Sequence, residues 1–169
     1  MSEAVAEARA AERLVLAFSL EGERFALDVS NVSEVLDPLP ATAVPNAGAF
    51  APAVLNVRGA VVPLVDIRQR LGMAPAASDA PQRLLVLDLT VAGEPTRVAM
   101  MADDVESIVE LPAGAVEPVP ALGIRWPAAF IEGVARHRDD ILILLDQETV
   151  FPPAAQAVDG ERGLGGPHQ

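Results

Sequence analysis

The stretch Ala53-Val54-Leu55-Asn56-Val57-Arg58-Gly59, followed by Val61-Val62-Pro63-Leu64-Val65-Asp66, contains two short apolar runs that meet at an Arg-Gly turn. Runs of this length, rich in β-branched residues and separated by a glycine turn, predict a β-hairpin. The Asp66 that ends the second run precedes Ile67–Leu71, which we expect to form one helical turn. The local structure is therefore a hairpin with its turn at Arg58-Gly59.

A second stretch near the C-terminal end matches this hairpin. When Gly133–Asp139 is laid over Ala53–Gly59, Arg138 falls on Arg58, Ile141–Leu145 falls on Val61–Val65, and Asp146 falls on Asp66. The identity is sparse, and a chance alignment of apolar runs is the alternative. The order of elements also repeats, however, as hairpin, valine-rich segment, proline-rich loop, hairpin and aspartate. We therefore interpret the pattern as a structural duplication.

The remaining segments complete two similar halves. Further strands are expected at residues 14–20, 25–27, 84–91 and 96–101, and the segment 31–36, with its counterpart 105–111, is expected to be a turn or helical segment. The prediction is a mainly β fold of two SH3-like five-stranded β-barrels packed together, with short helical segments. The halves would meet near residues 74–82, with strand exchange between them left open. Residues 1–13 are expected to be helical or frayed, residues 14–151 to form the domain, and residues 152–169 to be a disordered tail.

Composition excludes several function classes. The formal net charge is −12, and neither lysine nor cysteine is present, which argues against nucleic-acid binding, disulfides and thiolate metal sites. The apolar runs are shorter than the roughly 18 residues that a membrane helix needs, so direct membrane insertion is not expected. The start of the chain lacks the pattern of a signal peptide, and we expect a cytoplasmic location by elimination.

No catalytic constellation is apparent. Nucleotide-binding glycine motifs are missing, and the two histidines, His137 and His168, are far apart. The pairs Asp103-Asp104 and Asp139-Asp140 are adjacent, so on a strand they would point to opposite faces. We therefore predict no enzyme activity, no cofactor and no metal.

Three motifs carry a resemblance to a known family. They are Val32-Ser33-Glu34-Val35, the Ala53–Gly59 stretch, and Val62-Pro63-Leu64-Val65-Asp66-Ile67-Arg68. In this order and spacing they resemble the CheW family, which includes the regulatory domain of CheA-type kinases. The resemblance spans Leu14 to Phe151. Ala53 stands where the family usually has Gly, Gly48 where Pro is common, and Val57 where Leu is usual.

The resemblance implies a non-catalytic adaptor that couples methyl-accepting chemoreceptors to a CheA-type histidine kinase in chemotaxis. It implies that Arg58 lies by the groove where the cytoplasmic tip of a receptor docks, together with Val32, Glu34, Val35, Asn56 and Gly59. Phe130 and Ile131 are the candidates for contact with the regulatory domain of the kinase.

Other interpretations stay open at this stage. Arg58 could instead be a structural turn residue paired with Glu34 or Asp66, and the two valines could be plain core residues. The whole chain could serve a chemosensory-like pathway that controls surface motility or second messengers. A third interpretation is an orphan ligand-binding barrel, which would need a pocket of convergent polar groups.

Overall fold

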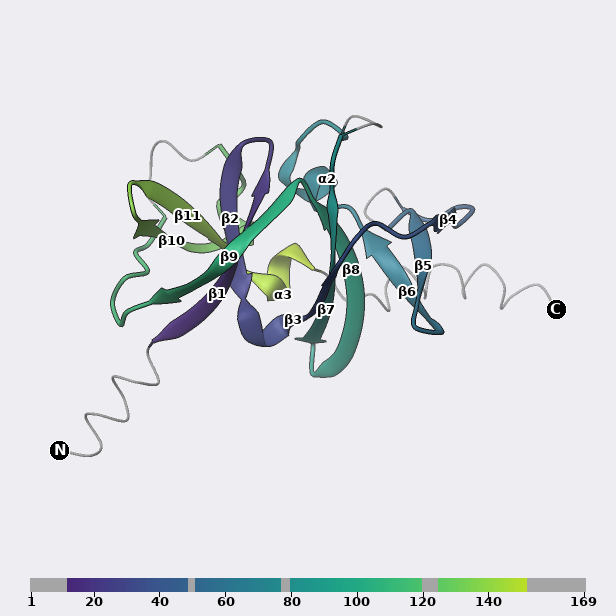
Figure 1. Cartoon of the computed structure of the whole chain (residues 1–169), viewed down its shortest axis with the longest axis horizontal. Coiled ribbons are helices and arrows are strands. Elements are labelled where there is room, and N and C mark those ends of the chain that lie inside the picture. The colour runs from purple at the N-terminus through teal and green to yellow at the C-terminus, as the bar shows by residue number, and fades with distance from the viewer. Residues whose placement is uncertain (1–11, 49–50, 77–79, 120–124, 152–169) are drawn as a thin grey trace.

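The computed structural model describes residues 12–48, 51–76, 80–119 and 125–151. These residues form mainly strands, with short helices at the ends of hairpins (Figure 1). In chain order the elements are β1 (Arg13–Leu20), β2 (Glu23–Asp28), η1 (Val29–Asn31), β3 (Val32–Leu36), β4 (Ala41–Ala43), β5 (Ala53–Val57), β6 (Ala60–Val65), α2 (Ile67–Leu71), β7 (Arg83–Val91), β8 (Glu94–Ala102), β9 (Asp104–Leu111), η2 (Ala128–Phe130), β10 (Ile131–His137), β11 (Asp140–Leu145) and α3 (Gln147–Val150). The prediction of a mainly β fold with short helical segments is confirmed.

The strands form two sheets that do not follow the two halves of the chain. The first sheet has the order β10-β11-β2-β1-β9, and the second has the order β3-β7-β8-β6-β5-β4. The N-terminal hairpin β1–β2 thus joins strands from the C-terminal half, and the hairpin β7–β8 joins strands from the N-terminal half. Two short parallel pairings, β11 with β2 and β6 with β8, connect the exchanged hairpins to their sheets.

Each sheet packs against an apolar cluster of its own. All strands of the first sheet, including its edge strands β9 and β10, contribute to one cluster: Val15, Ala17, Ala26, Val109, Leu111, Ala135, Leu142 and Leu144. The second sheet contributes Leu55, Val57, Val62, Leu84, Val86 and Ala99 to another. A sheet whose two edges reach the same cluster must curl around it, as the strands of a small barrel do.

The largest cluster lies between the sheets. Leu16, Phe18 and Leu20 of β1 point into it, as do Leu85, Leu87 and Leu89 of β7. Because alternate residues of these strands fill the clusters inside the sheets, β1 and β7 are buried on both faces, which explains their continuous apolar sequences. The short helix α3 lies between the two groups of strands (Figure 1), and Val150 and Phe151 at its end are buried in this cluster.

The structure corrects the expectation for two segments. Residues 31–36 were expected to be a turn or helical segment, but Val32–Leu36 is the strand β3, antiparallel to β7. Its counterpart is likewise the strand β9, antiparallel to β1. Only Val29–Asn31 is helical, as a single 3₁₀ turn capped by Asp28. Pairing with a neighbouring strand satisfies the backbone of these β-branched segments, and that pairing is not visible locally.

Two further differences concern segment ends. The proline-rich loop contains the short strand β4, which pairs with β5 and was not anticipated. Arg13, which was assigned to the N-terminal segment, is already part of β1. The expected helix before it and the expected tail after Phe151 lie outside the described residues.

The internal repeat is visible in the strand registers. In β5–β6 Leu55 pairs with Val62, and in β10–β11 Ala135 pairs with Leu142, so the aligned positions have the same register. Asp66 and Asp146 both cap the short helix that follows, accepting hydrogen bonds from the backbone N–H of Gln69 and of Glu148. The repeated sequence pattern therefore corresponds to repeated structure.

Candidate functional site

The turn between β5 and β6 presents Arg58 to solvent. Arg58 and Gly59 both have positive φ, of 52° and 88°, which is the geometry of a tight hairpin turn that glycine adopts without strain. The Asn56 side chain steadies the turn, because its Oδ1 accepts a hydrogen bond of 2.9 Å from the Gly59 N–H. The Asn-x-Arg-Gly motif thus folds locally into a support for the Arg58 side chain.

Glu34 of β3 holds the Arg58 guanidinium in a forked ion pair. Arg58 Nε donates to Oε2 and Oε1 at 2.9 and 3.1 Å, and Nη2 donates to Oε1 at 2.7 Å. The Arg58 side chain is 71% exposed, whereas the Glu34 side chain is 21% exposed. Hydrogen bonding to Arg58 lowers the pKa of the Glu34 carboxyl below its ordinary value, and the same bond raises the pKa of Arg58. The pair is therefore charged on both sides at neutral pH, and Nη1 of Arg58 takes no part in these bonds.

A second ion pair lies beside the first. Arg97 of β8 donates to the Asp88 carboxylate of β7 through Nε at 2.7 Å and Nη2 at 3.0 Å. Hydrogen bonds from Arg97 and, more weakly, from Ser33 lower the pKa of Asp88. The charge of Arg97 also contributes to the lowered pKa of Glu34. Sequence reasoning missed this pair, although two opposite charges at positions that face each other across a hairpin are its signal.

The valines of the Val32-Ser33-Glu34-Val35 motif face away from this charged group. Val32 and Val35 are half-buried and pack against the cluster between the sheets. Leu36, on the other face of β3, packs against the cluster inside the second sheet. The structure thus brings together Glu34, Asn56, Arg58 and Gly59, and it places the two valines on the opposite face of the same strand.

The two candidate kinase-contact residues differ in exposure. Ile131 is only 6% exposed and belongs to the cluster between the sheets. Phe130 is half-buried, and the Arg70 guanidinium lies 4.5 Å from the centre of its ring. Arg70 also donates to the Thr149 carbonyl oxygen at 2.7 Å, so α2, η2 and α3 meet at this point. Of the two residues, Phe130 is the one with side-chain surface accessible to a partner.

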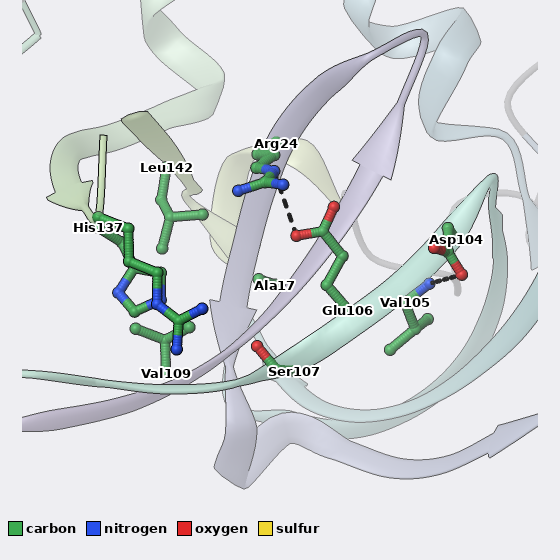
Figure 2. A pocket seen from close by; sticks show the side chains of 10 residues that line it. Ala17, Arg24, Asp104, Val105, Glu106, Ser107, Val109, His137 and Leu142 are labelled. Carbon is green, nitrogen blue, oxygen red and sulfur yellow. Dashed lines mark hydrogen bonds and ion pairs between the residues drawn. The ribbon is translucent and has the colours of Figure 1, made fainter. Parts of the chain in front are cut away.

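The surface also has an open hollow of about 450 Å³ at the first sheet. Figure 2 shows Ser107 and Val109 on the β9 side of this hollow, with His137 and Leu142 from the β10–β11 hairpin on the other side. Asp104 at its rim accepts a hydrogen bond from the backbone N–H of Val105. In the described part of the chain, no group of three or more histidine, cysteine, aspartate or glutamate residues is placed to hold a metal ion.

Asp103, the first of the adjacent aspartates Asp103-Asp104, has a structural role that the sequence did not indicate. It bonds Arg68 of α2 through Oδ1, and its Oδ2 accepts from the Glu21 N–H at 2.8 Å. Arg68 is the buried charged residue among the described positions, with 8% of its surface exposed. Over the same described ranges, no helix is both long and apolar enough to span a membrane.

Comparison with known proteins identifies the family. The family model described as CheW-like domain matches residues 14–154. The chain belongs to the CheW-like domain family. The resemblance expected from the motifs is thereby confirmed.

Relatives within the CheW-like family are similar over nearly their whole length. A probable chemotaxis protein CheW of Rhizobium etli is 28% identical over 151 residues, covering 89% of this chain and 95% of the relative. The chemotaxis protein CheW of Rhizobium meliloti is 29% identical over 140 residues, covering 83% and 88% of the two chains. The crystal structure of the scaffolding protein TtCheW from Thermoanaerobacter tengcongensis superposes with a TM-score of 0.71 at 24% identity, covering 82% of this chain and 87% of that one. This last match shows that the fold is shared.

Proposed function

We propose that this chain is a non-catalytic adaptor that couples chemoreceptors to a CheA-type histidine kinase in chemotaxis. Membership of the CheW-like family across residues 14–154 supports this role. Relatives that align over most of their length are named chemotaxis protein CheW, and a protein of the same fold is named a scaffolding protein. Binding at the cytoplasmic tips of receptors would place the adaptor in the cytoplasm.

The receptor-binding site in this proposal is centred on Arg58. The observation that carries it is an exposed arginine held in a fixed direction by Glu34 and by the Asn56–Gly59 turn, with Nη1 left for a partner. Because the orientation of the guanidinium is already fixed, the Arg58 side chain loses little conformational entropy when it binds carbonyl or carboxylate oxygens at the end of a receptor helix. Val32 and Val35, on the other face of β3, would act by holding the strand against the core.

Replacing Arg58 with alanine tests this site. We expect Arg58→Ala to weaken binding of a receptor cytoplasmic fragment by about tenfold or more, because a central arginine anchor is lost. Stability should change little, since an exposed ion pair contributes weakly to folding. Binding would be measured by titration and stability by thermal unfolding. Arg138→Ala, at the matching turn of the other hairpin, is the control and should bind the receptor fragment nearly normally.

Two results would count against the Arg58 site. Equal and small losses of receptor binding in the two variants would mean that Arg58 is a turn residue like its counterpart. A large fall in melting temperature for Arg58→Ala would mean that its ion pair with Glu34 supports the fold rather than a partner.

The kinase contact in this proposal includes Phe130. Phe130→Ala should weaken binding to the regulatory domain of the kinase several-fold, because a half-buried aromatic side chain is a typical interface anchor. Leu14→Ala, which removes an aliphatic side chain that is 49% exposed on the first sheet, is the control. If both variants bind the kinase domain equally well, Phe130 does not belong to the interface.

A further inference from the structure

The internal repeat gives the Glu34–Arg58 pair a counterpart in the first sheet. Glu34 pairs with Val86 in the register of β3 and β7, with a bulge just before it. In the register of β9 and β1 the same place, next to the matching bulge, is occupied by Ser107, which pairs with Ala17. Arg138 has the φ of Arg58, 53° against 52°, at the turn of the matching hairpin. Ser107 and Arg138 are therefore the structural equivalents of Glu34 and Arg58.

The counterpart site lacks the carboxylate. A serine hydroxyl cannot neutralise a guanidinium, and in the part of the chain that the structure describes Arg138 makes no hydrogen bond or ion pair. Its neighbour Arg24 is already paired, through Nε with Glu106 at 3.2 Å and through Nη1 with Asp140 at 2.5 Å. The other nearby carboxylates are Asp104, which accepts from the Val105 backbone, and Asp139 in the turn itself.

The space next to Ser107 is open. The hollow of about 450 Å³ is lined by Ser107, Arg138 and His137, and at its floor by Ala17, Val109 and Leu142 of the cluster inside the first sheet. Figure 2 shows Ser107 facing the hollow from β9, while Arg24 and Glu106 are joined to each other at its upper side. The strand β9 is an edge of its sheet and exposes Glu106, Ser107 and Ile108 in succession. An extended segment can lie against such an edge.

We propose that this hollow is a second docking site, which binds an extended segment of a partner protein that carries a glutamate or aspartate. The partner's carboxylate bonds Arg138 and the Ser107 hydroxyl, and so completes between two chains the pair that Glu34 and Arg58 form within one. Charge complementarity supports this occupant, because Arg138 has no ionic partner in the lining, while the lining carboxylate of Glu106 is paired with Arg24 and that of Asp104 lies at the rim. The site is distinct from the one centred on Arg58, so its test does not depend on receptor binding.

The first test supplies the missing carboxylate within the chain. Ser107→Glu should raise the thermal midpoint slightly, by about 1–2 °C, because the equivalent Glu34 fits at the same register position and one exposed ion pair with Arg138 stabilises the fold only weakly. Ser107→Gln is the control, because glutamine has the shape of glutamate without its charge. The double variant that combines Ser107→Glu with Arg138→Ala should not show the rise in thermal midpoint. An equal response to the Glu and Gln substitutions, or a gain that persists without Arg138, would overturn the proposal.

The second test uses a peptide as the partner. The probe is a capped peptide with the sequence of residues 30–36, Ser30-Asn31-Val32-Ser33-Glu34-Val35-Leu36, in which Glu34 supplies the single carboxylate in a strand-forming context. Binding would be followed by NMR at the Arg138 side chain and the His137 ring. The peptide should bind about tenfold more tightly than its Glu34→Gln version, and binding should weaken as salt is added. Arg138→Ala and Ser107→Glu should abolish the difference, whereas Arg136→Ala, which removes an exposed arginine of the same hairpin outside the hollow, should not.

Three outcomes would overturn the assignment. Equal binding of the two peptides would mean that no carboxylate is recognised. A change in the Arg138 signals when residues 152–169 are deleted would make the chain's own tail the occupant. Self-association that depends on Arg138, measured by sedimentation, would make it a second copy of this chain.

Discussion

Replacing Arg68 tests how the two sheets are held together. Arg68 lies on α2, after the second sheet's strand β6, and its Nη2 bonds the Asp103 carboxylate between β8 and β9. Its Nη1 reaches Glu21 Oε2 at 3.4 Å, in the turn of the first sheet's β1–β2 hairpin, and the Ala74 carbonyl at 3.2 Å. One buried guanidinium thus connects both sheets.

The expected cost follows from burial. The Arg68 side chain is 10% exposed, whereas the side chains of Asp103 and Glu21 are 29% and 33% exposed. Removing one partner of a fully buried pair costs about 3–5 kcal/mol, because the remaining charge is stranded. Since water still reaches the two carboxylates, we expect Arg68→Met to lower the free energy of unfolding by about 2–3 kcal/mol. For a domain of this size that corresponds to a fall in melting temperature of roughly 5–10 °C.

Urea unfolding would measure the loss as a change in the free energy of unfolding. Arg83→Met is the matched control, because Arg83 and Asp37 form an exposed contact at 3.9 Å; its effect should stay within about 0.5 kcal/mol. A double-mutant cycle with Asp103→Asn should show a coupling of about 1 kcal/mol or more. A loss below about 1 kcal/mol for Arg68→Met, or no coupling with Asp103, would refute the role of this pair.

Two further predictions concern charge and packing. Ion pairing lowers the pKa of Glu34 and Asp88 in the folded state, so the unfolded chain binds more protons near pH 4 and the free energy of unfolding should fall as the pH drops from about 5 toward 3. Glu34→Gln should make the free energy of unfolding depend less on pH over this range. An unchanged pH dependence in the variant would contradict the prediction. Gly133→Ala should lower the free energy of unfolding by about 2 kcal/mol, because the new Cβ would lie 2.6 Å from the Glu117 carbonyl oxygen and disturb the β-bridge between Glu117 and Val134. The control is Gly48→Ala, which has open space around it and should unfold at nearly the wild-type temperature.

Part of the candidate site could be predicted from local sequence alone. The Asn-x-Arg-Gly motif specifies a tight turn, because glycine accepts its positive φ and the asparagine caps it. What the sequence left open was the partner of Arg58, for which Glu34 and Asp66 were both candidates. The pairing of β3 with β7 brings Glu34 to the turn, while Asp66 caps α2 instead.

Eight of the eleven strands, the hairpin turns, the repeat and the family could be determined from the sequence by itself, since each depends on residues that are near neighbours in the chain or on a motif of fixed spacing. Only the tertiary structure decided which hairpins share a sheet, because both halves offer similar apolar faces and either hairpin could complete either sheet. It also decided that β3 and β9 are strands, since their backbones are satisfied only by pairing with the exchanged strands β7 and β1. That exchange leaves Glu34 beside Arg58 in one sheet and Ser107 with Arg138 in the other, and this difference between equivalent places appears only once the registers are known.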